Sequence, residues 1–256
     1  MSKLHAITLV LASQRSGSTL LCRDIASLGG MGEPKEYFLD ILGAKARPDL
    51  READVLEQIA QGERANAAGV GAVKLMLSYA PKIDQYIRQA DSVAPRRAVQ
   101  NVIDWAQGRF ERVNLVALVR NNSLEQAMSR AVAGMTDVWH RNKVGAGADP
   151  YADAQLPVGQ LNRAILQELP LVMRQNDMIR DIAKANAPVC QLISYEQLAA
   201  SAEDSSALLT AHARQQGFAP QAEVARRSLR KLIDKEMSRK IKADFKSFMQ
   251  DRLAQW

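Results

Sequence analysis

The sequence of 256 residues is poor in cysteine and in aromatic residues, and each shortage excludes a class of protein. Its two cysteines, Cys22 and Cys190, form no C-x-x-C pair, which excludes a zinc ribbon and a dithiol redox motif. We expect both to be buried free thiols of a cytoplasmic protein. Aromatic residues make up 5% of the chain, so its basic segments lack the stacking platform of a nucleic-acid-binding module.

Long apolar runs and clusters of metal ligands are also missing. The apolar run at residues 6–12 is too short to cross a membrane. His5, His140 and His212 are scattered, so we expect no metal site and place these histidines at the surface. A net charge of +6 favours an anionic partner such as a nucleotide, although a mildly basic surface is also common in proteins that have none.

Apolar runs with β-branched residues alternate along the chain with helix-like patterns. The runs that we interpret as strands buried on both faces are residues 6–12, 68–77, 112–120 and 187–195. Helical patterns cover residues 19–28, 50–67, 82–90, 97–107, 124–133, 159–186, 196–216 and 224–253. This alternation predicts an α/β fold, a three-layer αβα sandwich with a mainly parallel central sheet. No linker separates the strands, so we expect a single domain over residues 1–256.

A polar loop with the sequence SQRSGST, residues 13–19, connects the first strand to the first helix. In a parallel sheet such a loop lies at the carboxyl ends of the strands, where ligands bind, and the N-terminus of the next helix attracts anions. Gly17 lets an anion approach the backbone, and Arg15 adds a fixed cation. We therefore predict a phosphate or sulfate site formed by Ser13, Gln14, Arg15, Ser16, Gly17, Ser18 and Thr19. The alternative is a tight turn with a capped helix.

The loop is not a Walker A motif, because no lysine follows Gly17 and no glycine stands five residues before that position. A magnesium-dependent nucleotide kinase or phosphotransferase is therefore a disfavoured alternative. A non-enzymatic basic protein that binds nucleotides or nucleic acid is another alternative, based on charge alone.

A second anion site is expected where the third strand ends at Arg120. Ser129 follows on the next helix, and these two side chains could hold a second phosphate group. Alternatively, Arg120 caps that helix or pairs with Glu125. Two anion sites together suit a ligand with two separated phosphate-type groups.

These segments resemble the bacterial trehalose 2-sulfotransferase-like family. The most specific likeness lies in LVLASQRSGSTLL and GEPKEYF, and weaker likeness lies in GAVKLM, VRNNSLEQAMSRAVAGMTDVW and YEQLAAS. The resemblance implies a fold like that of P-loop nucleotide kinases. It also implies transfer of a sulfuryl group from 3′-phosphoadenosine-5′-phosphosulfate (PAPS) to a hydroxyl of a carbohydrate or glycolipid, without a metal and without a nucleic-acid partner. Family members can pair as dimers, so a homodimer is a further expectation.

The resemblance assigns catalytic and acceptor-binding roles by position. Glu36 takes the place of the family's general base, and Glu33 is expected to face the acceptor. Arg15 would stabilise the leaving phosphate. Lys74 is expected to point into the same cleft and bind substrate, since a buried lysine needs an anionic partner. The alternative is that Lys74 extends its charge to solvent or pairs with a carboxylate. Without the family, Glu33 and Glu36 are interpreted as a turn residue and a helix-capping residue.

The resemblance also assigns the donor contacts. The loop at residues 13–19 would hold the 5′-phosphosulfate, and Arg120 with Ser129 would hold the 3′-phosphate. Arg230, in the basic C-terminal segment, is a further expected donor contact, although most of that segment is expected to be a solvated helix face. Residues 145–154 form either a lid or a plain surface loop.

Overall fold

The computed structural model describes residues 4–41, 50–62, 69–139, 156–221 and 235–254. The chain divides into two compact units. The larger unit consists of Met1–Asn121 and Gln175–Arg227, and the smaller unit consists of Asn122–Arg174 and Ser228–Trp256. Because compactness does not define a family domain, the single domain over residues 1–256 stays a prediction.

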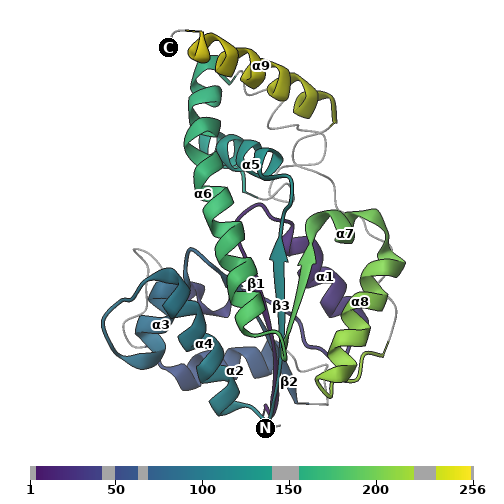
Figure 1. The fold of residues 1–256 in the computed structure, drawn as a ribbon. Helices are drawn as coiled ribbons and strands as arrows, with labels where there is room; N and C mark the ends of the chain where they lie inside the picture. Colours follow the sequence, from purple (N-terminus) through teal and green to yellow (C-terminus); the bar gives the residue numbers. More distant parts are fainter. Residues whose placement is uncertain (1–3, 42–49, 63–68, 140–155, 222–234, 255–256) are drawn as a thin grey trace. The chain divides into compact units, whose positions relative to one another are not determined.

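The larger unit is built on one parallel sheet of four strands in the order β2-β1-β3-β4 (Figure 1). The strands are β1 (Ala6–Ala12), β2 (Val70–Met76), β3 (Arg112–Val119) and β4 (Cys190–Ser194). All seven residues of β1 are buried, because this strand is central and covered on both faces. Since the strands run in the same direction, their carboxyl ends meet at one edge of the sheet, which we call the carboxyl edge.

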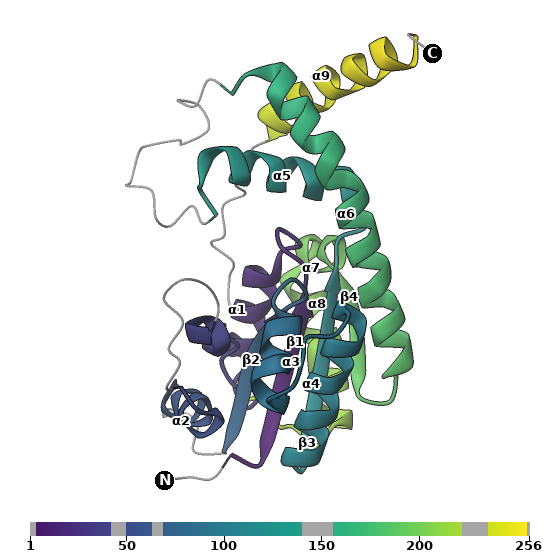
Figure 2. The same cartoon turned by 90° about the vertical axis from the view of Figure 1, so that its left-hand side faces the viewer.

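Helices cover both faces of this sheet (Figures 1 and 2). Their bounds are α1 (Ser18–Leu28), α2 (Glu52–Gly62), α3 (Ala80–Arg88), α4 (Pro95–Arg109), α6 (Val158–Ala185), α7 (Tyr195–Ala200) and α8 (Ala202–Gln215), with a short 3₁₀ helix η1 (Tyr37–Ile41). The alternation of β1 side chains divides the core in two. Ile7, Leu9 and Leu11 pack with α2, α3, α4 and the C-terminal part of α6. Val10 and Ala12 pack with α1, α7 and α8 on the opposite face.

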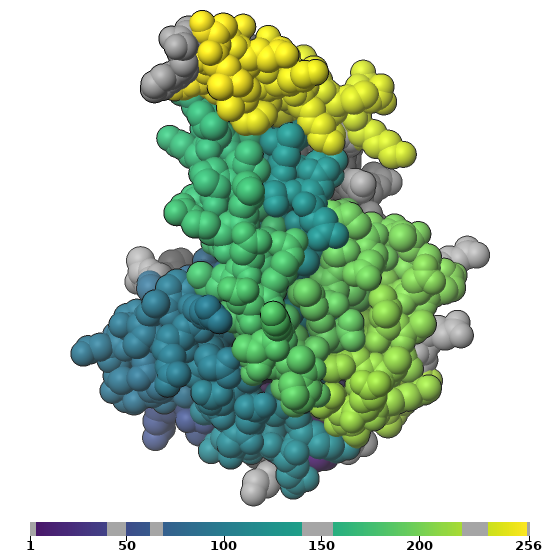
Figure 3. Space-filling model, in the orientation of Figure 1, coloured from purple at the N-terminus to yellow at the C-terminus, as the bar shows by residue number. Residues whose placement is uncertain are grey.

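The predicted three-layer αβα sandwich with a parallel central sheet is thus confirmed for the larger unit. In the space-filling view, α3 and α4 (blue to teal) lie beside the C-terminal part of α6 (green) on the surface of this unit (Figure 3). Among the described residues, no helix combines the length and the apolar composition that a membrane span requires.

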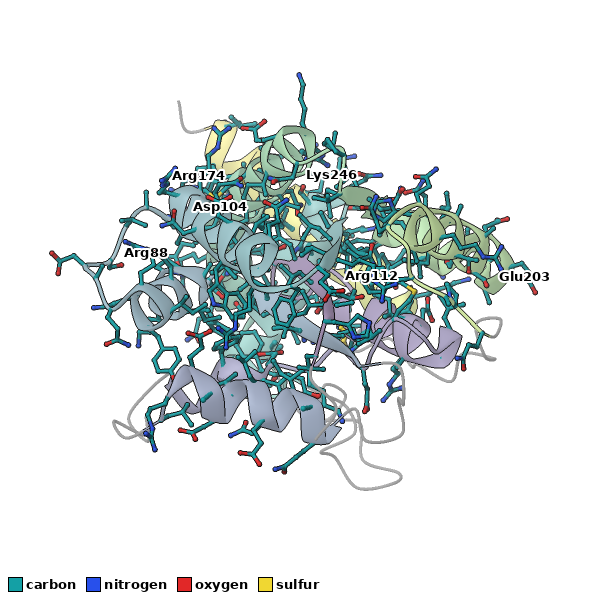
Figure 4. The ribbon with its side chains drawn as sticks, turned by 90° about the horizontal axis from the view of Figure 1, so that it is seen from below. Arg88, Asp104, Arg112, Arg174, Glu203 and Lys246 are labelled. Carbon is teal, nitrogen blue, oxygen red and sulfur yellow. The ribbon has the colours of Figure 1, made fainter. Side chains whose placement is uncertain are left out.

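Two sequence-based predictions about the larger unit need correction. The helix expected over residues 196–216 is interrupted at Ser201, whose backbone is extended. The Ser201 Oγ caps α8 by accepting a hydrogen bond from Asp204 N at 2.8 Å. The surface position predicted for His212 is wrong, because this side chain is buried and its Nε2 lies 3.3 Å from the Val189 carbonyl oxygen. His5 is partly buried, and its Nε2 lies 2.6 Å from Nη2 of Arg112, which is labelled in Figure 4.

The smaller unit packs α5 (Ser123–Thr136) and α9 (Lys235–Leu253) with the N-terminal part of α6. Its core contains Met128, Val132, Ile165, Ile241 and Phe245. Asn122 caps α5 by accepting a hydrogen bond from Glu125 N at 3.0 Å, and the Glu125 carboxylate pairs with Lys242 at 2.6 Å.

Candidate active site at the carboxyl edge

The loop after β1 has the geometry of a helix N-terminus that can receive an anion. Gly17 has a left-handed backbone with φ 99° and ψ 14°, which favours glycine. The first helical hydrogen bond runs from Leu20 N to the Gly17 carbonyl oxygen at 2.9 Å, so the N–H groups of residues 17–19 precede the helical ladder. The first turn of α1 carries no acidic residue. The positive end of this helix is therefore directed at the carboxyl edge without a carboxylate from its own first turn.

Two further residues give the loop its shape. The buried Ser16 donates a hydrogen bond from Oγ to the Ser13 carbonyl oxygen at 2.7 Å. Arg15 has a left-handed backbone with φ 61°, which is uncommon for a residue other than glycine and is often found at functional sites. The anion contacts predicted for residues 13–19 stay predictions, and the geometry adds that the Ser16 hydroxyl serves the loop itself.

Arg120 directly follows β3 and contacts the loop. Its Nη1 donates a hydrogen bond to the Arg15 carbonyl oxygen at 3.4 Å. Its guanidinium carbon lies 4.6 Å from the centre of the Tyr195 ring, a cation–π contact. A guanidinium therefore lies beside the predicted 5′-phosphosulfate loop within the same unit.

Glu36 and Lys74 form an ion pair with an Nζ to Oε1 distance of 2.7 Å. The side chains are 11% exposed for Lys74 and 22% exposed for Glu36, so the two charges neutralise each other largely away from water. Lys74 points to the sheet face that α1 covers, because it alternates with Val73 and Leu75 of the opposite face. The pairing with a carboxylate that we left open for Lys74 is therefore present.

The backbone brings Glu36 to Lys74 along the open edge of β2. Lys74 N donates a hydrogen bond to the Lys35 carbonyl oxygen at 2.9 Å, and Lys35 pairs with Val73 in a parallel bridge. Because Lys35 is held beside β2 by this bridge, Glu36, the next residue, lies close to Lys74. Glu33 forms a separate ion pair with Lys35 at 2.8 Å, and both of these side chains are about half exposed.

Cys22 of α1 lies within electrostatic reach of this ion pair. Burial raises the pKa of its thiol from 9.0 to about 12, while the charge of Lys74 lowers it and the charge of Glu36 raises it. Lys74 itself lies on the face of the sheet that α1 covers, and α1 is the helix that begins at the loop. Glu36, Lys74 and the loop are held by neighbouring parts of one unit.

Two tyrosines that the sequence did not single out as site residues lie against the loop. Gln14 Nε2 donates a hydrogen bond to the Tyr79 hydroxyl at 3.5 Å. The ring of Tyr195 occupies the space where a side chain of Gly17 would begin. Both tyrosines lie shortly after a strand, and that position could have identified them as neighbours of the carboxyl edge.

The remaining predicted residues belong to the smaller unit or lie outside the described residues, so the structure does not test their assignments. Ser129 is a buried residue of α5 in the smaller unit, so its partnership with Arg120 stays a prediction. Arg230 and residues 145–154 lie outside the described residues. Within the described part of the chain, no group of three or more His, Cys, Asp or Glu side chains is arranged to hold a metal ion.

Comparison with known proteins identifies a family. The model of the family described as Stf0 sulphotransferase matches residues 8–244, which include parts of both units. The trehalose 2-sulfotransferase of Mycolicibacterium smegmatis is 50% identical over 60 residues, which are 23% of this chain and 22% of that protein. The match therefore spans about a fifth of the length of that relative.

Two solved structures are also similar. The sulfotransferase domain from the curacin biosynthetic pathway has a TM-score of 0.46 and 16% identity, over 90% of this chain and 80% of that one. The sulfotransferase domain of the Synechococcus PCC 7002 olefin synthase has a TM-score of 0.40 and 18% identity, over 85% of this chain and 74% of that one.

Proposed function

Because the chain belongs to the Stf0 sulphotransferase family, we propose that it transfers a sulfuryl group from PAPS to a hydroxyl of a carbohydrate or glycolipid, with Glu36 as the general base. The sulfotransferase class follows from the family. The observation that carries the finer proposal is the partly buried Glu36–Lys74 pair, because Lys74 lies on the sheet face covered by α1, the helix that begins at the predicted anion loop. The name of the relative that is 50% identical over 60 residues supports a carbohydrate acceptor.

The chemistry of the loop fits the 5′-phosphosulfate end of PAPS. Backbone N–H groups at a helix N-terminus bind phosphate-type oxygens without further side chains, and Arg15 and Arg120 add positive charge to the same edge. We assign the 5′ end to residues 13–19 and the 3′-phosphate to Arg120 and Ser129. Arg230 is proposed as an additional contact at the 3′ end.

When bound, PAPS supplies an activated sulfuryl group attached to a phosphate leaving group. Glu36 accepts the proton of the acceptor hydroxyl while the hydroxyl oxygen forms its bond to sulfur and the bond from sulfur to the phosphate oxygen breaks. Arg15 and the N-terminus of α1 stabilise the negative charge that develops on the leaving phosphate. The products are a sulfate ester and 3′-phosphoadenosine-5′-phosphate, with the proton on Glu36.

We propose that Lys74 orients the general base Glu36 rather than binding the acceptor. Its ammonium holds the Glu36 carboxylate at 2.7 Å and so fixes the orientation of the base before the acceptor arrives. Glu33, which is about half exposed, is proposed to bind acceptor hydroxyls. We further propose that the enzyme works in the cytoplasm, where its two cysteines stay reduced, and that it forms a homodimer.

Calorimetry tests the donor class. We expect 3′-phosphoadenosine-5′-phosphate to bind the full chain more tightly than AMP or ATP with magnesium, and we expect Arg120→Ala to remove that preference. Lys82→Ala, a charge removed from α3, is the matched control and should leave the affinity unchanged. Preference for ATP with magnesium, or no binding of any of these nucleotides, would contradict the proposal.

A further inference from the structure

We propose that Tyr195 is a positioning residue that couples the loop at residues 13–17 to Arg120 through its aromatic ring. The inference rests on the proposed function only in assigning the loop and Arg120 to the donor. The coupling itself is a property of the ligand-free larger unit. It would set the spacing between the two groups that we assign to the 5′ and 3′ ends of PAPS.

The register of the sheet places Tyr195 beside Arg120. Val119 of β3 pairs with Ser194 of β4, so Arg120 and Tyr195 directly follow the paired ends of two neighbouring parallel strands. The guanidinium carbon of Arg120 lies 4.6 Å from the ring centre, within the range of a cation–π contact. The strand register thus places the Tyr195 ring against the Arg120 guanidinium.

The same ring contacts the loop at Gly17. A Cβ added at Gly17 would overlap Cδ2 of Tyr195 and would lie 3.0 Å from Cε2. Glycine is therefore needed here for two independent reasons, the left-handed backbone with φ 99° and the presence of the ring. Arg120 also contacts the loop directly, because its Nη1 donates a hydrogen bond to the Arg15 carbonyl oxygen at 3.4 Å.

The backbone around Tyr195 is held by a helix cap. The Ser194 Oγ accepts a hydrogen bond from Gln197 N at 3.2 Å, and Ser194 N donates to Gln197 Oε1 at 2.8 Å. This reciprocal capping box fixes the start of α7 and with it the direction of the Tyr195 side chain. On the Arg120 side, Asn176 Nδ2 donates to the Arg120 carbonyl oxygen at 3.0 Å. Hydrogen bonds therefore hold the main chain on both sides of the cation–π contact, at Tyr195 and at Arg120.

The test compares Tyr195→Leu with Tyr195→Phe in the full chain. Leucine removes the ring, whereas phenylalanine keeps the ring and removes only the hydroxyl. Tyr86→Leu is the matched control, because Tyr86 is also partly buried and packs with Phe38 on the opposite face of the sheet. Hydrogen exchange of peptides covering residues 13–21 and 115–121 reports the coupling without any ligand, and calorimetry with 3′-phosphoadenosine-5′-phosphate reports its effect on binding.

We expect Tyr195→Leu to speed exchange in both peptides and to weaken binding about tenfold, or ~1.4 kcal/mol. Tyr195→Phe should stay within about twofold of the wild type in affinity, since the cation–π and packing contacts need only the ring. Unchanged exchange in Tyr195→Leu would overturn the inference. An equal loss of binding in Tyr195→Phe would also overturn it, because the hydroxyl would then act directly.

The two readouts separate this inference from the proposed function. If the wild type binds no bisphosphate, the proposed function fails, and hydrogen exchange still decides the coupling. If the wild type binds the bisphosphate and Tyr195→Leu matches it in both exchange and affinity, the donor assignment stands and the coupling is wrong.

Discussion

At the scale of the residue, burial controls the reactivity of the two thiols. Cys22 is a buried free thiol as expected, but the burial expected for Cys190 is wrong, since this residue is only partly buried. Burial raises the pKa of Cys22 and of Cys190 to about 12 from an ordinary 9.0. Because the thiolate is the reactive form, we predict that the folded protein reacts with iodoacetamide at about pH 8 far more slowly than the urea-unfolded chain. Mass spectrometry of the alkylated protein measures both rates. Rapid modification of Cys22 in the folded protein would show that its helix face is open to solvent.

Site residues differed in how far the sequence alone could place them. The predictions for Gly17 and for the end of β3 at Arg120 rest on local pattern, and the structure places both residues at the carboxyl edge. The ion pair of Lys74 could be anticipated only as one of two alternatives, because its partner comes from a segment that lies along the edge of β2. The contact of Tyr195 with Gly17 could not be predicted, since it depends on the order and register of β1, β3 and β4.

At the scale of the element, α3 carries an ion pair near its C-terminus. Arg88, labelled in Figure 4, donates from Nη2 to Asp84 Oδ2 at 2.6 Å, and the Asp84 side chain is 1% exposed. Burial raises the pKa of Asp84, but hydrogen bonds from Arg88 and Asn101 and the nearby guanidinium charges outweigh it, so the pKa lies below its ordinary value. The stability that the ionised carboxylate contributes is present above its ordinary pKa and is lost as the pH falls through the lowered one.

We therefore predict that Arg88→Met lowers the free energy of unfolding by about 2 kcal/mol at neutral pH, because it removes donors from a buried carboxylate. Urea denaturation measures the loss. Arg51→Met is the control, since Arg51 lies 4.0 Å from Asp54 and is largely exposed, and its effect should stay below about 0.5 kcal/mol. Equal effects of the two substitutions would contradict this explanation of α3.

Helices and strands that a local residue pattern marks could be predicted from the sequence, whereas one break between two helices was missed. The bounds of β1 and, within one residue, of α1 match the expected segments, because an apolar run followed by a helical stripe is a local property. The division of the expected helix at residues 196–216 into α7 and α8 was missed, although Ser201 with Asp204 has a capping pattern. Helical periodicity on both sides concealed that single extended residue.

At the scale of the whole molecule, the family resemblance drawn from short motifs is confirmed by the match over residues 8–244. The parallel sheet is confirmed as well, because alternating strands and helices restrict the topology strongly. The division into two compact units was not anticipated, since no change in composition marks Asn122 or Arg174. The long helix α6 instead continues through the second of these boundaries.

Global stability should fall on mild acidification because of His212. Burial lowers the pKa of this imidazole, and the backbone hydrogen bonds with Val189 and Leu115 only partly offset it. The unfolded chain then binds more protons than the folded one, so stability is full above about pH 6.5 and decreases as the pH falls toward the lowered pKa. We predict that the unfolding free energy of His212→Gln depends less on pH between about 5 and 7 than that of the wild type. Parallel slopes in urea titrations would exclude His212 as the cause.

The most direct test of the central claim is sulfuryl transfer by Glu36→Gln. With radiolabelled PAPS and a panel of sugars and glycolipids that begins with trehalose, the wild type should form a sulfate ester. Glu36→Gln should bind 3′-phosphoadenosine-5′-phosphate normally while kcat falls by about 10²–10⁴-fold, the usual contribution of a general base. Glu33→Gln is the matched control and should raise KM for the acceptor while kcat is retained. A Glu36→Gln enzyme that transfers as fast as the wild type would contradict the account.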